Sequence, residues 1–169
     1  MPCVIADTSP VFYLARLRHL QLLRVLYGTV HVPGEVWAEL QAGNRVDPAL
    51  APMLRAAQSE GWLICHEVPA PTDPAVLLEL DRGEAEAITL AKRLHADLLV
   101  IDESKGRAVA ASLGVPIIGT LGVLATAKRE GLIPSLHTEF QRLRSGTGFR
   151  FSVHLEREIL EAAGESPAS

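Results

Sequence analysis

Short apolar runs alternate with longer amphipathic stretches along most of the chain. Runs of four residues at 3–6, 29–32, 62–65, 98–101 and 115–118 have the length and apolar character of buried strands. Between them, apolar residues recur three and four positions apart, which is typical of helices. This alternation predicts an α/β fold in which a parallel sheet carries helices on both faces.

Glycines and prolines set the expected ends of the helices. One or two helices are predicted over 10–27, before Gly28, and three prolines predict a loop over 68–74. Further helices are predicted over 35–43, 48–60, 80–94, 104–113 and 121–130, with one or two amphipathic helices from residue 135 on. The last helix is expected to pack against the body of the protein or a partner, and residues 165–169 to be disordered.

Composition narrows the class of protein. The chain has 169 residues, of which 48% are hydrophobic, and this suggests one globular domain. Its net charge is −4, and it has no long run of basic residues. This argues against a protein that holds DNA by electrostatics alone, but not against a nuclease whose metal ions meet the phosphates. Cys3 and Cys65 form no paired-cysteine motif, and the six histidines lack metal-ligand spacing. With no signal peptide or membrane-spanning apolar stretch, a cytoplasmic protein is predicted.

Acidic and hydroxyl side chains stand where predicted strands end. Asp7 directly follows the first strand, with Ser9 close behind it. Asp102 and Glu103 follow the fourth strand, and Thr120 follows the fifth. The carboxyl ends of parallel strands share one edge, where ligand crevices form, so these side chains are expected to converge there. The alternative for Asp7 or Ser9 is a plain helix cap.

Two glutamates lie near the starts of predicted helices. Glu39 is about one turn into its helix, and Glu84 comes three residues after Asp81, as in a capping box. At about 100° per residue, Glu84 borders the apolar face of its helix whereas Glu86 points towards solvent. A solvated helix face is the alternative for Glu39, and the capping box is the alternative for Glu84.

These positions predict a cluster of carboxylates, formed by Asp7, Glu39, Glu84 and Asp102. Like charges gathered so closely cost stability unless cations neutralise them. Oxygen ligands suit hard divalent ions, and Mg²⁺ or Mn²⁺ are the natural choices. A carboxylate-bound metal centre is a recurring device for cleaving phosphodiesters.

Five pieces of the chain resemble a known family: VIADTSPVFYLARL, VPGEVWAEL, LDRGEAEAITLA, LLVIDE and IIGTLGVLATAKREGLIP. Their order and spacing are similar to those of PIN domains, specifically the DUF3368 group of predicted nucleic-acid-binding proteins. The resemblance implies a three-layer α/β/α fold with a central parallel sheet, and a metal-dependent ribonuclease that uses Mg²⁺ or Mn²⁺. We expect the PIN-like domain to span residues 1–150, with a C-terminal helix and disordered tail over 151–169.

By this resemblance, the catalytic and metal-binding residues are Asp7, Glu39, Glu84 and Asp102, with Glu86 as a second candidate for the third acid. Ser9, Thr120 and Glu103 are expected to support them. Lys105 and Arg107, a compact basic patch beside Asp102, are candidates for contacting RNA. The resemblance also suggests the toxin of a toxin–antitoxin pair, with a small antitoxin as partner, and a homodimer is predicted.

The sequence departs from the family pattern at two sites. The third acid is Glu in GEAEA, where Asp is common, and the fourth site reads Val-Ile-Asp-Glu rather than Thr-x-Asp. Two other functions stay open: a PIN-like module that binds RNA or protein without cutting, and a phosphatase with a strand-end Asp nucleophile. Such phosphatases usually need a second Asp two residues after the first, where this chain has Ser9.

Overall fold

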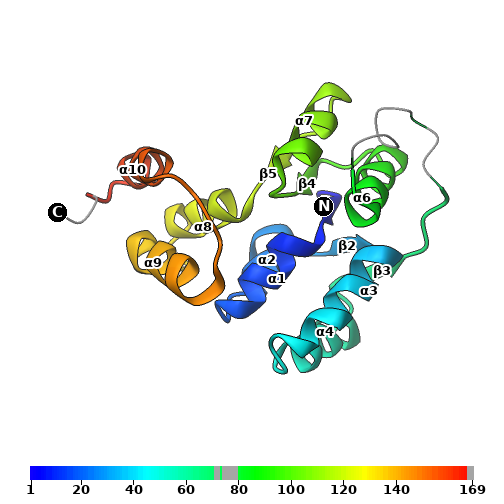
Figure 1. The fold of residues 1–169 in the computed structure, drawn as a ribbon, viewed down its shortest axis with the longest axis horizontal. Helices are drawn as coiled ribbons and strands as arrows, with labels where there is room; N and C mark the ends of the chain where they lie inside the picture. Colours follow the sequence, from blue (N-terminus) through cyan, green and yellow to red (C-terminus); the bar gives the residue numbers. More distant parts are fainter. Residues whose placement is uncertain (71–72, 74–79, 167–169) are drawn as a thin grey trace.

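The computed structural model describes residues 1–70, 73 and 80–166 of the chain. The predicted loop over 68–74 therefore lies partly outside the described residues, and so do the last three residues of the predicted disordered end. Figure 1 shows helices arranged around a short central sheet.

The sheet has five strands and is parallel throughout, as the sequence predicted. The strands are β1 (Val4–Ala6), β2 (Val30–Pro33), β3 (Leu63–His66), β4 (Leu98–Val100) and β5 (Ile117–Ile118). Their order is β3-β2-β1-β4-β5, so β4 lies between β1 and β5. β1 and β4 pair up to their last residues, Ala6 and Val100, and both strands therefore end at the same edge.

Helices join the strands and extend the chain beyond the sheet. They are α1 (Thr8–Arg16), α2 (Gln21–Tyr27), α3 (Gly34–Ala42), α4 (Leu50–Ser59), α6 (Arg82–Arg93), α7 (Ser104–Ser112), α8 (Thr120–Arg129), α9 (Leu136–Thr147) and α10 (Val153–Ala162), with a short 3₁₀ turn η1 (Gly43–Arg45). The stretch predicted as one or two helices before Gly28 is two, α1 and α2. None of the helices in the described part of the chain is long and apolar enough to cross a membrane.

Side chains of β1 alternate between two cores, one on each face of the sheet. Val4 and Ala6 belong to the larger core, which also takes residues of α1, α2, α8 and α9. Ile5 points the other way, into a smaller core with residues of α6 and α7. All three side chains are fully buried. This is the period-2 pattern of a strand covered on both faces, and it places helices on either side of the sheet in three layers.

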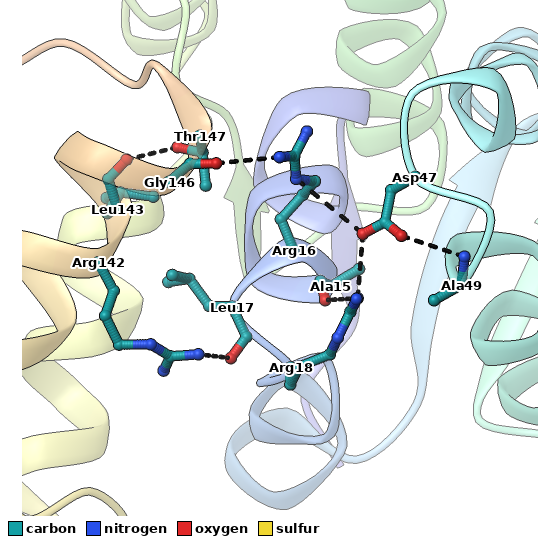
Figure 2. A network of polar contacts seen from close by, with 10 residues as sticks. All are labelled: Ala15, Arg16, Leu17, Arg18, Asp47, Ala49, Arg142, Leu143, Gly146 and Thr147. Carbon is teal, nitrogen blue, oxygen red and sulfur yellow. Dashed lines mark hydrogen bonds and ion pairs between the residues drawn. The ribbon is translucent and has the colours of Figure 1, made fainter.

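A polar network fixes the far end of α1 (Figure 2). Arg16 donates a hydrogen bond to the carbonyl oxygen of Gly146 near the end of α9, at 2.9 Å. Arg18 donates to Asp47, between η1 and α4, at 3.0 Å. These contacts tie α9 and the α3–α4 connection to α1, the helix that directly follows Asp7. The C-terminal helix α10 packs on the body of the protein, with Leu160 fully buried in the larger core.

Candidate functional site

Asp7 lies at the carboxyl end of β1, where the chain turns into α1. Its backbone is extended (φ −83°, ψ 172°) and its backbone N–H donates to Val100 of β4 at 2.9 Å. The residue is only 5% exposed, and its side chain makes no capping hydrogen bond to α1. A simple helix cap therefore does not account for a carboxylate at this buried position.

Asp102 follows β4, the strand next to β1, so the two aspartates come from neighbouring strand ends as predicted. Thr120 holds the Asp102 carboxylate with its backbone N–H and its hydroxyl, each at 2.7 Å. Arg107 donates to the carbonyl oxygen of Ile101 at 3.0 Å. A Cβ on Gly119 would lie 2.9 Å from both the Asp102 and the Arg107 side chains, so any larger residue here would displace them.

Glu84 is the third residue of α6 and has two roles. It forms the predicted capping box with Asp81: its backbone N–H donates to the Asp81 side chain at 2.9 Å, and its own carboxylate accepts from the Asp81 backbone N–H at 3.4 Å. Glu84 is also only 7% exposed, and it lies close enough to Asp7 for its charge to raise the pKa of Asp7. The capping role and the position beside the other acids are therefore compatible.

Glu39, on α3, is clamped between the starts of α1 and α6. The Thr8 hydroxyl donates to its carboxylate at 2.5 Å. On the other side, a Cβ added to Gly83 would lie 2.7 Å from Glu39 Oε1, so the glycine allows α6 to approach this closely. Thr8 was not among the predicted site residues, although its place directly after Asp7 is a signal that could have found it.

The remaining predicted residues are spread around this core. Ser9 is half-buried in the first turn of α1, and within the described part of the chain it makes no hydrogen bond to a site carboxylate. Glu103 and Lys105 are exposed beside Asp102. Arg107 is half-buried, and its bond to Ile101 makes it part of the wall of the site.

The prediction that Glu86 points towards solvent is wrong. Its side chain is 12% exposed and accepts a hydrogen bond from the backbone N–H of Glu35, at the start of α3, at 3.0 Å. Arg82 lies 3.9 Å from the Glu86 carboxylate. The reason is that α6 packs against α3 as well as against the sheet, so it has two covered faces instead of one.

Burial and mutual repulsion make the cluster hard to ionise. Burial raises the pKa of Asp7 to about 7, with a smaller increase from the charges of Glu84, Asp81 and Glu39, while the backbone N–H of Thr8 opposes the rise. Burial likewise raises the pKa of Glu84 to about 7, and Asp81, Glu103 and Glu39 contribute. The pKa values of Glu39 and Asp102 are also raised by burial, against the hydrogen bonds from Thr8 and Thr120.

The donor chemistry of this cluster fits a hard divalent cation. Carboxylate oxygens are the ligands that Mg²⁺ and Mn²⁺ prefer, and a bound cation would lower the raised pKa values. In the described ranges, no three acidic, histidine or cysteine side chains are already spaced to hold a metal ion. The carboxylates of Glu39 and Asp102 instead accept hydrogen bonds from the hydroxyls of Thr8 and Thr120. The residues therefore supply the right ligand type, but not a finished coordination shell.

A doubly covered parallel sheet with acidic side chains gathered at its carboxyl edge is the architecture of an α/β protein that binds its ligand at the strand ends. A family model described as DUF3368: PIN domain matches residues 3–165, so the chain belongs to this family. PIN domains are generally nucleases that act on nucleic acid and typically use divalent metals. The family and the three-layer fold expected from the resemblance are thereby confirmed. No curated protein matches the chain.

Proposed function

We propose that this PIN domain is a ribonuclease that depends on Mg²⁺ or Mn²⁺. The observation that carries the proposal is that Asp7, Glu39 and Glu84 come together from three separate elements. Thr8, next to Asp7, donates to Glu39, and Gly83, next to Glu84, packs against Glu39. The charges of Glu39 and Glu84 add to the rise in the pKa of Asp7. Gathering carboxylates in a buried crevice costs stability, and such an arrangement is typical of sites that bind a cation.

Four residues would hold the cation: Asp7, Glu39, Glu84 and Asp102. A bound divalent ion supplies a water of lowered pKa and compensates charge on the leaving oxygen. Thr8 and Thr120 orient the carboxylates of Glu39 and Asp102. Lys105 is exposed, and it would meet a phosphate of the RNA, a contact that positions the strand without reading its sequence.

The finer assignments stay predictions. They are the role as a toxin, a small antitoxin as partner and a homodimer.

The first test of the proposal is RNA cleavage. Single-stranded RNA incubated with the protein should be cut in Mg²⁺ or Mn²⁺ and left intact in EDTA. Protein that binds RNA yet cuts nothing in either metal would instead be a non-catalytic PIN-like module.

Mn²⁺ is expected to raise the thermal unfolding midpoint, because the ion binds the folded cluster and not the unfolded chain. At a hundredfold excess over the dissociation constant, the gain is about 2.7 kcal/mol, or about 5–10 °C for a domain of this size. The double variant Asp7→Asn/Asp102→Asn should lose this rise, whereas Glu130→Gln, at an exposed acid on α8's end, should keep it. An equal rise in the double variant would place the ion elsewhere.

Glu84→Gln is expected to lower cleavage by about 100-fold, the usual loss for one electrostatic contact to the reacting centre. Glutamine serves a capping box as glutamate does, so α6 should still fold and the loss should report on the missing charge. The matched variant is Glu86→Gln, whose side-chain oxygen can still accept from the Glu35 backbone N–H. We expect it to cut within about threefold of wild type. The cleavage rates of the two variants are measured under single-turnover conditions. If Glu86→Gln lost activity and Glu84→Gln kept it, Glu86 would be the third acid.

A further inference from the structure

A cavity of about 480 Å³ lies at Asp102, the one acid of the cluster that lines it. Asp102, Arg107 and Gly119 line it where it meets the site. The other walls are β5 and the start of α8, together with the segment that joins α9 to α10 and the first turns of α10. This volume falls in the range of about 300–1,000 Å³ that is usual for sites that bind small organic groups.

Aromatic side chains form one wall of the cavity and are held in place by contacts behind them. Phe149 meets the ring of Tyr13, on α1, edge to face, with the ring centroids 4.8 Å apart. The guanidinium of Arg144 lies 4.2 Å from the ring centroid of Phe151. The contact between Arg16 and Gly146 holds the end of α9 just before this segment (Figure 2). The wall is therefore fixed before anything binds.

The apolar lining is not sealed off from solvent by the described residues. Phe149 and Phe151 are half-buried, and Leu155 is 40% exposed. Two arginines accompany this lining, Arg107 beside Asp102 and the exposed Arg150 between the two phenylalanines. Arg107 has Asp102 beside it, but a purely apolar partner would bring no counter-charge to the exposed Arg150. A nucleotide offers a flat ring to the aromatic wall and a phosphate to Arg150.

The Gly119–Thr120 turn connects this cavity to the site. Thr120 donates hydrogen bonds to Asp102, and the preceding Gly119 lines the cavity directly against the Asp102 and Arg107 side chains. A strand whose phosphate lies at Asp102 would therefore present its next base to the cavity. Resting on the proposed ribonuclease function, we propose that this cavity binds a base of the single-stranded RNA substrate, next to the bond that is cut. Unstacked bases bound on aromatic side chains are the usual mode of recognising single strands.

The test measures binding in EDTA, so that no cleavage is needed. Calorimetry would compare a ribohexamer of random sequence with an abasic hexamer that has the same ribose-phosphate backbone. Wild type should bind the ribohexamer at least about tenfold more tightly, as expected for one base stacked on an aromatic wall. Phe149→Leu and Leu155→Ala should each reduce this preference several-fold. Leu132→Ala is the matched control, because Leu132 is also 40% exposed but does not line the cavity.

Equal affinity for the two hexamers would overturn the proposal, and so would losses in Phe149→Leu and Leu155→Ala no larger than in Leu132→Ala. An apolar peptide that binds the cavity while the ribohexamer does not would overturn it in favour of a protein partner. Leu155→Ala keeps the test valid if Phe149→Leu fails to fold, because Leu155 is partly exposed. RNA cleavage with base-independent binding would overturn this proposal alone, whereas base-dependent binding without cleavage would support it and overturn the nuclease.

Discussion

Asp7→Asn is expected to lower metal-dependent RNA cleavage by about 100- to 1,000-fold, the loss usual for removing one contact that stabilises the transition state. Asp7 is more buried than Asp102, the other proposed ligand at a strand end, and its backbone N–H donates a hydrogen bond to β4. Asparagine keeps the shape of the side chain but removes the charge that a divalent cation needs. Cleavage of a labelled single-stranded RNA in saturating Mn²⁺ measures the effect.

The affinity of Asp7→Asn for RNA shows whether its lost cleavage comes from the missing charge or from misfolding. Because the exposed Lys105 and Arg150 would still meet phosphates, binding of the RNA by Asp7→Asn should change by less than about threefold. Asp47→Asn is the matched control, since Asp47 belongs to the ion-pair network with Arg18 and lies outside the acidic cluster. It should cleave like wild type. An Asp7→Asn protein that keeps more than a tenth of the wild-type rate would remove Asp7 from the proposed metal ligands.

The free energy of unfolding of the metal-free protein is expected to fall by several kcal/mol between pH 5 and pH 8. Burial raises the pKa of Asp7 from 3.8 to about 7 in the folded state. The folded protein then binds more protons than the unfolded chain between these two values, so stability is fully present below the lower pKa and is lost as the pH rises through the higher one. For Asp7 alone the full loss is about 4 kcal/mol, of which about 2.6 kcal/mol falls between pH 5 and pH 8.

Glu84, with its pKa also raised to about 7, should change stability in the same direction. Its contribution is smaller, because the pKa of Glu84 rises from 4.5 whereas that of Asp7 rises from 3.8. Urea unfolding in EDTA at several pH values measures the trend. Asp7→Asn should be more stable than wild type at pH 8 but not at pH 5, and Mn²⁺ should restore wild-type stability at pH 8. Stability that is constant or rises over this range would contradict the expectation.

Much of the fold follows from local signals in the sequence. A buried strand such as Val4–Ala6 must be apolar at every position because both of its faces are covered, and this is visible without knowing its neighbours. The acid directly after the strand is equally visible, and parallel pairing then places Asp7 and Asp102 at neighbouring strand ends. The capping box of Asp81 and Glu84 is also local, since it depends only on residues three positions apart.

The sequence by itself thus determined the alternating fold and the edge at which the acids gather, because strand burial and helix caps are short-range properties. Only the tertiary structure decided that Glu86 faces α3, since a helical wheel records one apolar face and cannot show a second helix packed on another. It also brought Thr8 to Glu39 and Phe149 to Tyr13. Such contacts join residues far apart in the chain, and they depend on how whole helices dock, which no local period encodes.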